Sequence, residues 1–199
     1  SKGNNLTILD YVEGRAANEA GRLSAEHLSE LERCVMPGSG TCGAMFTANT
    51  ISTITEAMGM MLPMGASHPA DIDATSNLHD DVLSQIGPTV DALIAALETG
   101  LRPRDIMTMQ AFENAITVVT ALGGSTNVFL HLLAIAREAD VPLTIEHIQQ
   151  VGERVPLIAN LQPHGPYAMV SLHQVGGVPV VMKELLSAGL LHGDAMTIT

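Results

Sequence analysis

The chain of 199 residues contains no tryptophan, and aromatic residues make up only 3% of it. Lysine and arginine together number 9, against 21 acidic residues, so the formal net charge is −12. Nucleic-acid phosphates are held mainly by clustered basic side chains, and this sequence has no basic stripe. We therefore expect no nucleic-acid partner.

Cysteine is equally scarce, with only Cys34 and Cys42. A secreted disulfide scaffold needs more cysteines, so this count fits a reducing compartment. No apolar run reaches membrane-spanning length, and the opening residues, SKGNNLTILD, contain no apolar signal core. These absences predict a soluble, cytoplasmic protein with no membrane partner.

Helical periodicity is the main positive signal, and the 46% hydrophobic content can fill one sizeable core without an internal domain boundary. Ser24 and Thr144 are expected helix N-caps. The β-branched stretch TANTISTIT, within the third predicted helix, also suits a strand. The final residues, DAMTIT, predict a short strand. The predicted helices cover Leu6–Ala20, residues 25–33, Phe46–Met61, Val82–Leu97, Ile106–Leu122, Val128–Ala139, Ile145–Arg154 and a segment that opens at residues 176–179.

Cys42 lies in the glycine-rich stretch PGSGTCG, shortly before the helix expected from Phe46. A helix N-terminus favours a thiolate, and Gly40 and Gly43 let the backbone approach whatever the sulfur binds. The spacing leaves three interpretations open: a nucleophile, a metal or cluster ligand, and a buried structural thiol. A nucleophile needs a histidine base that the scattered histidines do not single out. A metal site needs several ligands, and Cys34 accompanies Cys42 at a spacing unlike CxxC.

The stretch GGSTN, residues 123–127, separates two predicted helices. A helix that stops at the glycines and restarts with Ser125 as N-cap presents backbone N–H groups beside two hydroxyls and an amide. Ser125, Thr126 and Asn127 are therefore candidate substrate-binding residues for a carboxylate or phosphate. The alternative is that they only cap the two helices.

A third candidate is the polar stretch SHPADID, with His68, Asp71 and Asp73. These side chains could contribute ligands to a divalent cation. A solvated acidic loop is the commoner arrangement for such residues.

Three long segments, in the same order, resemble the dihydroxy-acid dehydratase / phosphogluconate dehydratase family. They are ELERCVMPGSGTCGAMFTANTISTITEAMGMMLP, AFENAITVVTALGGSTNVFLHLLAIA and GPYAMVSLHQVGGVPVVMKELLSAGLLHGD. The resemblance extends over nearly the whole chain, from Leu6 to Thr199. The chain has Met36-Pro37-Gly38 where the family usually has Cys-Pro-Gly, and Gly43-Ala44-Met45 where it has Gly-Gly-Met.

The resemblance implies an enzyme that removes water from a 2,3-dihydroxy acid to give a 2-keto acid. In such enzymes three cysteines hold an iron–sulfur cluster (2Fe-2S or 4Fe-4S), one iron stays open for the departing hydroxyl, and Mg²⁺ binds the acid end. Cys42 matches the last of the three cluster cysteines. Cys34 matches no ligand position, and we expect it to be a buried thiol.

The resemblance also implies that residues 1–199 form a helix-dominated part of the larger N-terminal catalytic domain of a two-domain, homodimeric α/β protein. The other two cluster cysteines, one of them in a Cys-Asp-Lys motif that also serves Mg²⁺, would then precede residue 1, and the catalytic serine would follow residue 199. We therefore expect the catalytic residues and most Mg²⁺ ligands outside this chain, and the chain alone to be inactive.

Within the family, the segment GGVPVVMKELLSAGLLHGD favours the dehydratase of branched-chain amino-acid biosynthesis. The alternative is a sugar-acid or phosphogluconate dehydratase. From another class, the alternative is a non-enzymatic helical remnant that binds anions at GGSTN.

Overall fold

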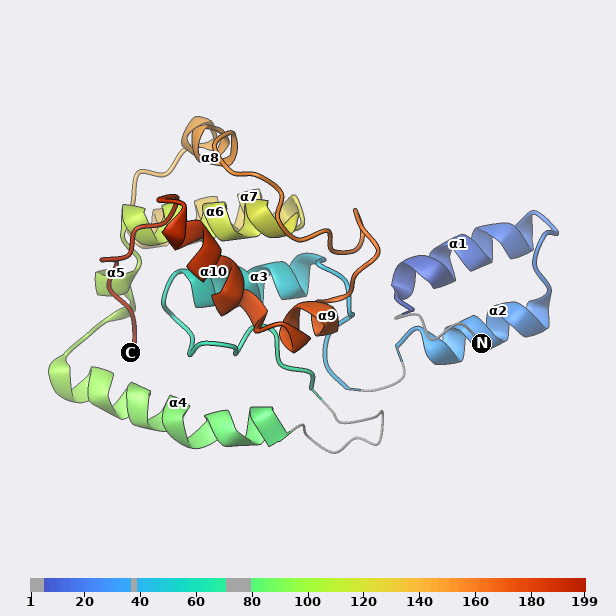
Figure 1. Cartoon of the computed structure of the whole chain (residues 1–199), viewed down its shortest axis with the longest axis horizontal. Coiled ribbons are helices and arrows are strands. Elements are labelled where there is room, and N and C mark those ends of the chain that lie inside the picture. Colours follow the sequence, from blue (N-terminus) through green and yellow to red (C-terminus); the bar gives the residue numbers. More distant parts are fainter. Residues whose placement is uncertain (1–5, 37–38, 71–79) are drawn as a thin grey trace.

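The computed structural model describes residues 6–36, 39–70 and 80–199, and helices dominate these ranges (Figure 1). Among the described residues the only β pairing is an isolated bridge between Leu161 and Tyr167. The helices are α1 Ile8–Glu19, α2 Ala25–Cys34, α3 Thr47–Ala57, α4 Asp80–Thr99, α5 Pro103–Ile106, α6 Met109–Leu122, α7 Asn127–Glu138, α8 Ile145–Gly152, α9 Met169–Gln174 and α10 Gly177–Ser187.

The core is built around α6, which packs most extensively against α3. Most of α6 is buried, including Phe112 and Ile116, because its sequence is apolar on nearly every side. α10 packs against both α6 and α3, and α8 packs against α6. Buried Leu132 on α7 and Leu185 on α10 join the same apolar cluster. α3 therefore lies at the centre of the molecule, and the loops at its two ends lie against this core (Figure 1).

The first two helices form a hairpin that projects from the core, at the right of Figure 1. They approach closely at Gly14, where a Cβ atom would lie 2.6 Å from Leu31 Cδ1. The expected cap of α2 is confirmed, because Ser24 Oγ accepts a hydrogen bond of 3.2 Å from the His27 N–H. The hairpin leads directly into the cysteine-bearing loop before α3.

The helix predictions hold for most of the chain, with a few local differences. The stretch TANTISTIT forms the predicted helix and not the competing strand, but α3 ends at Ala57, before the expected Met61. α6 begins at Met109 because Thr108 Oγ1 accepts a hydrogen bond from the Ala111 N–H, and the residues before it form the separate short helix α5. The short helix α9 has no counterpart among the predictions. Thr144 caps α8 as expected, accepting a 3.2 Å hydrogen bond from the His147 N–H.

The short strand expected at residues 194–199 does not form. The Ile198 N–H donates to the Gly59 carbonyl at 2.8 Å, but a strand needs a repeated ladder of such bonds. Thr197 packs close to Gly59, where a Cβ atom would lie 2.7 Å from its Cγ2. The described part of the chain is therefore helical, and the α/β class of a larger domain stays a prediction.

The prediction that Cys34 is a buried thiol is wrong, because this residue is exposed. It is the last residue of α2, and no residue of that helix is buried. The physical reason is that α2 packs against α1 in the projecting hairpin, so that only the narrow side of α2 facing α1 is covered.

α4 carries exposed apolar side chains along most of its length, as expected if more protein packs on this chain. Leu97 is 74% exposed, and Ala96 is the only residue of α4 that is buried. Five of its six exposed large apolar residues, all but Ile94, follow a spacing that alternates between three and four, as in a helix that packs along another helix. Monomers rarely leave a large apolar patch uncovered. The α4 face consists of Leu83, Ile86, Val90, Leu93 and Leu97.

Not one helix in the described ranges combines the length and the apolar character that crossing a membrane requires.

Candidate functional site

Cys42 lies half-buried on the loop that leads into α3, close to the N-terminus of that helix as the sequence predicts. The loop needs glycine at Gly40, where φ is +96° and a Cβ atom would lie 2.7 Å from the Cβ of Ala70. Gly43 is less crowded, since a Cβ atom there would meet Ala168 at 3.7 Å. At Gly40 the backbone of the loop therefore lies too close to Ala70 for a residue with a larger side chain.

Asn49, on the first turn of α3, holds the cysteine loop by its side chain. Its Nδ2 group donates to the carbonyls of Cys42 at 2.8 Å and Ala44 at 2.6 Å. Its Oδ1 accepts a 2.9 Å hydrogen bond from Thr41 Oγ1. Asn49 is 7% exposed, so these bonds lie away from bulk water. The backbone of Cys42 is thus fixed without using its sulfur atom.

The cysteine loop is also tied to the segment before α9. The Met45 N–H donates to the Gln162 carbonyl at 2.7 Å, and the Met169 N–H donates to the Gly43 carbonyl at 2.8 Å. Both bonds hold the backbone that directly follows Cys42. The third segment of the family resemblance therefore packs directly beside the first.

The GGSTN turn joins α6 to α7, and the glycines end α6 as predicted. Gly123 has φ of +70°, and a Cβ atom on Gly124 would lie 2.2 Å from Val119 Cγ2. The N-cap position of α7 is Thr126 and not the predicted Ser125, because the helix begins one residue later, at Asn127. Ser125 Oγ still accepts a 3.3 Å hydrogen bond from the Asn127 N–H. Ser125 is half-buried, whereas Thr126 and Asn127 are exposed. The turn is accessible to a ligand, as a binding role requires.

The cysteine loop and the GGSTN turn meet at the first turns of α3. Thr50 Oγ1 accepts a 3.0 Å hydrogen bond from the Ser125 N–H and donates to the Met45 carbonyl at 3.4 Å. Asn127 Nδ2 donates to Thr47 Oγ1 at 2.6 Å. Two stretches that the sequence singles out separately thus form one site at a helix N-terminus, where the dipole favours anions. Thr50 was not predicted as part of this arrangement, because nothing in the linear sequence marks it.

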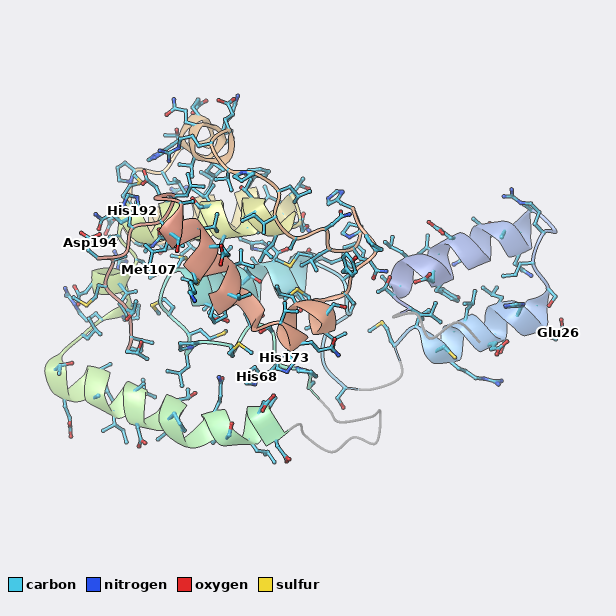
Figure 2. The ribbon with its side chains drawn as sticks, viewed as in Figure 1. Glu26, His68, Met107, His173, His192 and Asp194 are labelled. Carbon is cyan, nitrogen blue, oxygen red and sulfur yellow. The ribbon has the colours of Figure 1, made fainter. Side chains whose placement is uncertain are left out.

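The third candidate, SHPADID, is only partly described, because Asp71 and Asp73 lie outside the described residues. His68 is described, and Figure 2 shows its side chain close to that of His173. With Asp81 these two histidines form a group of three potential metal ligands. Asp81 and His173 were missed by the sequence analysis, because they belong to helices distant in the chain.

Two carboxyl groups near the core have shifted pKa values. Burial raises the pKa of Glu56, and hydrogen bonds from the N–H groups of Ala66 and Met64 lower it in part. For Glu113, burial acts in the same direction, but hydrogen bonds from His192 and His147 outweigh it, so the pKa is lowered. Neither carboxyl lies on the cysteine loop. Glu56 holds the backbone at Met64 and Ala66, and Glu113 holds the side chains of His192 and His147.

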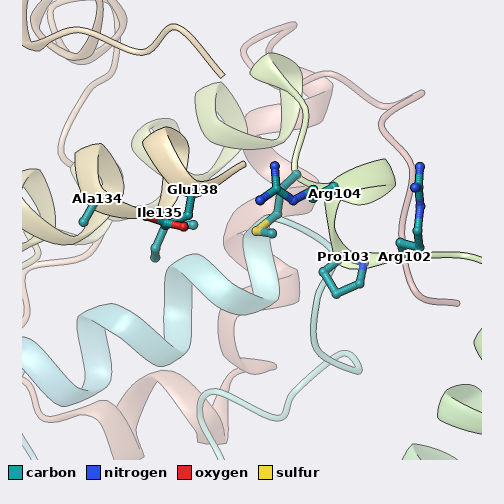
Figure 3. A pocket seen from close by; sticks show the side chains of 7 residues that line it. Arg102, Pro103, Arg104, Ala134, Ile135 and Glu138 are labelled. Atoms are coloured by element: carbon teal, nitrogen blue, oxygen red, sulfur yellow. The ribbon is translucent and has the colours of Figure 1, made fainter. Parts of the chain in front are cut away.

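A hollow of about 620 Å³ lies elsewhere, between α5 and the C-terminal half of α7 (Figure 3). Its lining is mainly apolar, with charged groups at the edge. Asn127 and Glu138 are the first and last residues of α7, about 16 Å apart along the helix axis. The hollow is therefore separate from the GGSTN turn. Its lining residues are Arg102, Pro103, Arg104, Met107, Ala134, Ile135 and Glu138.

Comparison with known proteins adds a second line of evidence. The family described as "Dihydroxy-acid/6-phosphogluconate dehydratase N-terminal" matches residues 1–199. A dihydroxy-acid dehydratase of Nocardioides sp. is 49% identical over 197 residues, which cover 99% of this chain and 34% of that protein. A protein of the same name from Sulfurisphaera tokodaii is 49% identical over 198 residues, or 100% of this chain and 34% of that protein. Another, from Albidiferax ferrireducens, is 47% identical over 198 residues, which again cover 100% of this chain and 34% of that protein. The chain thus spans about a third of the length of the curated relatives it matches.

Proposed function

Since the chain belongs to the dihydroxy-acid/6-phosphogluconate dehydratase N-terminal family, we propose that its protein is a hydro-lyase that converts a 2,3-dihydroxy acid to a 2-keto acid. The relatives named above are dihydroxy-acid dehydratases, which favours the enzyme of branched-chain amino-acid biosynthesis over a sugar-acid or phosphogluconate dehydratase. We place this reaction in the cytoplasm. The observation that carries the proposal is that the loop that carries Cys42 and the GGSTN turn are both held by side chains of the first turns of α3.

Cys42 is the residue that we propose as an iron ligand. It fits this role because its backbone is held by Asn49 while the thiol is half-exposed on a glycine-bearing loop near a helix N-terminus. A bound iron–sulfur cluster would supply a Lewis-acidic iron for the departing hydroxyl. The described residues do not place Cys42 in a group of three metal ligands. The remaining cluster ligands, and most ligands of the Mg²⁺ that we also propose, would therefore come from outside this chain.

The GGSTN turn is the part of the site that we propose for the substrate. Thr126 and Asn127 are exposed, and their backbone N–H groups belong to the N-terminal end of α7. This end favours the carboxylate of the acid. Asn127 Nδ2 is already held by Thr47 Oγ1, so the amide is oriented before a ligand arrives. These residues bind and orient the acid beside Cys42 and move no proton themselves.

A homodimer is also part of the proposal. The exposed α4 face supports further protein packing on this chain, since it offers five large apolar side chains along one helix. The family resemblance provides the second reason to expect a second copy.

The test compares two cysteines in the intact protein purified without oxygen. We expect Cys42→Ser to abolish both the visible absorbance of the cluster and the formation of keto acid from a branched 2,3-dihydroxy acid. Cys34→Ser is the matched control, because Cys34 is exposed at the end of α2 and should leave both largely unchanged. An intact, fully loaded cluster in Cys42→Ser would overturn the assignment of Cys42 as a ligand. Turnover of a sugar acid but not of the branched dihydroxy acid would instead favour a sugar-acid dehydratase.

A further inference from the structure

Three potential metal ligands come together from three separate elements: His68 from the loop after α3, Asp81 from the first turn of α4, and His173 from α9. One ligand atom of each lies within 4.8 Å of the other two. The two imidazole rings are 5.3 Å apart between centroids and inclined at 67°. Figure 2 shows both histidines on the side of the core that faces α4.

The separations are close to those that a metal ion imposes. With metal–ligand bonds of about 2.0–2.1 Å, neighbouring ligands of a tetrahedral site lie about 3.4 Å apart. His173 Nε2 and Asp81 Oδ2 are already 3.4 Å apart. The other separations must shorten by at most about 1.4 Å, which side-chain rotation alone can provide. The backbone therefore needs no rearrangement to close the site.

The loop that carries His68 is held rigidly from inside the core. The buried Glu56 carboxylate accepts hydrogen bonds from the N–H groups of Met64 at 2.8 Å and Ala66 at 2.9 Å. The start of α10 presses on the same loop at Gly177, where a Cβ atom would lie 2.3 Å from Ser67 Oγ. Because α9 immediately precedes α10, this packing also sets the position of His173 relative to His68. Metal sites depend on such fixed supports.

α4 presents Asp81 to this loop through one face. Gln85, one turn further along, donates from Nε2 to the Pro63 carbonyl at 2.8 Å. Residues four apart lie on the same face of a helix, so Asp81 and Gln85 both face the loop. The His173 side chain is 15% exposed and that of Asp81 46%, so the group lies at the edge of the core, accessible to an ion in solution.

We propose that His68, Asp81 and His173 bind a divalent transition-metal ion, with Zn²⁺ as the best fit. Two imidazoles and one carboxylate suit Zn²⁺, Fe²⁺ or Cu²⁺, whereas Mg²⁺ and Ca²⁺ prefer all-oxygen sites. Three protein ligands leave a coordination position for water. The ion would clip the first turn of α4 to α9 and to the loop after α3. This site shares no residue with the proposed cluster and does not depend on Cys42.

The test is a titration of the intact, chelator-treated protein with Co²⁺ as a spectroscopic substitute for Zn²⁺. We expect one saturable site per chain whose difference spectrum has the visible bands of nitrogen and oxygen ligands, without the intense near-ultraviolet band of a thiolate. Zn²⁺ should displace Co²⁺. His173→Ala and Asp81→Asn should each weaken Co²⁺ binding by more than about 100-fold. The reason is that replacing a residue that only hydrogen-bonds to a metal ligand already lowers metal affinity by about 10–100-fold.

Two controls make the result decisive. His192→Ala alters the other histidine–carboxylate group of the described chain, at Glu113, and should leave Co²⁺ affinity unchanged. Cys42→Ser should also leave it unchanged, which separates this site from the proposed cluster. Asp81 is the safer variant for folding because its side chain is 46% exposed. The proposal would be overturned by the absence of saturable binding, by a thiolate band, or by equal affinity in Asp81→Asn. The group would then be an ion pair beside two rings packed edge to face.

Discussion

Thr50 links the cysteine loop to the GGSTN turn, and its replacement by valine tests that link directly. The substitution keeps the branched shape and removes the hydroxyl. Thr50 is fully buried, and its Oγ1 accepts the Ser125 N–H at 3.0 Å while donating weakly to the Met45 carbonyl at 3.4 Å. In Thr50→Val the Ser125 N–H loses its acceptor, and the valine methyl cannot replace it.

The expected loss of stability follows from that unpaired donor. Leaving a buried N–H without a partner costs about 1–3 kcal/mol, and the half-burial of Ser125 favours the lower part of this range. For chains of this size each kcal/mol lowers the melting temperature by about 2–4 °C. We therefore expect Thr50→Val to lower the free energy of unfolding of the domain by about 1–2 kcal/mol. In the larger intact protein the melting temperature, measured by calorimetry or thermal circular dichroism, should fall by less than the value for a chain of this size.

Thr53 provides a matched control on the same helix. It is also fully buried, but its Oγ1 has no hydrogen-bond partner among the described residues. Thr53→Val removes an unsatisfied buried hydroxyl, so it should leave the melting temperature unchanged or raise it. Thr50→Val should also raise KM for the dihydroxy acid without loss of iron, whereas Thr53→Val should do neither. Equal destabilisation by the two substitutions would refute the assigned role of Thr50.

Two further predictions concern charge and assembly. The lowered pKa of Glu113 means that its ionised form stabilises the fold above its ordinary pKa of about 4.5, and that this contribution is lost as the pH falls below that value. In chemical denaturation, wild type should therefore exceed Glu113→Gln in stability at pH 7, and the two should converge as the pH falls below about 4.5; a constant difference would contradict this. Leu97→Glu should weaken self-association by tenfold or more in analytical ultracentrifugation while leaving the far-ultraviolet spectrum intact, because a buried leucine contributes about 1.5–3 kcal/mol. An unchanged dimer would place the subunit interface away from α4.

The helices were predictable because their signals are local. Ser24 and Thr144 cap helices whose apolar periodicity continues for several turns, so both starts could be located to the residue. α9 was missed because six residues are too few to show a period. The strand expected at the end failed for the opposite reason: DAMTIT has the composition of a strand, but the described residues provide no neighbouring strand for it.

The site was predictable only in pieces. Cys42 and Ser125 could be singled out because glycine and capping residues mark special backbone conformations in the sequence itself. The link between the loops that carry them depends on Thr50, whose hydroxyl resembles that of Thr53 in every respect visible to sequence. Cys34 was expected to be buried because it matches no ligand position of the family, but the hairpin that carries it has no second layer in the described structure. Tertiary packing decided each of these outcomes.

α3 explains why so many polar and β-branched residues occupy the centre of the molecule. Asn49, Thr50 and Glu56 are all buried on this helix, and each satisfies the backbone of a different loop. Asn49 holds the cysteine loop, Thr50 the GGSTN turn, and Glu56 the loop that carries His68. Asparagine and threonine each lower helix propensity by about 0.5 kcal/mol relative to alanine, whereas one satisfied hydrogen bond contributes about 1 kcal/mol. A helix of better intrinsic formers would fold locally more readily, but it would leave three loops without the contacts that place both the proposed cluster ligand and the proposed metal site.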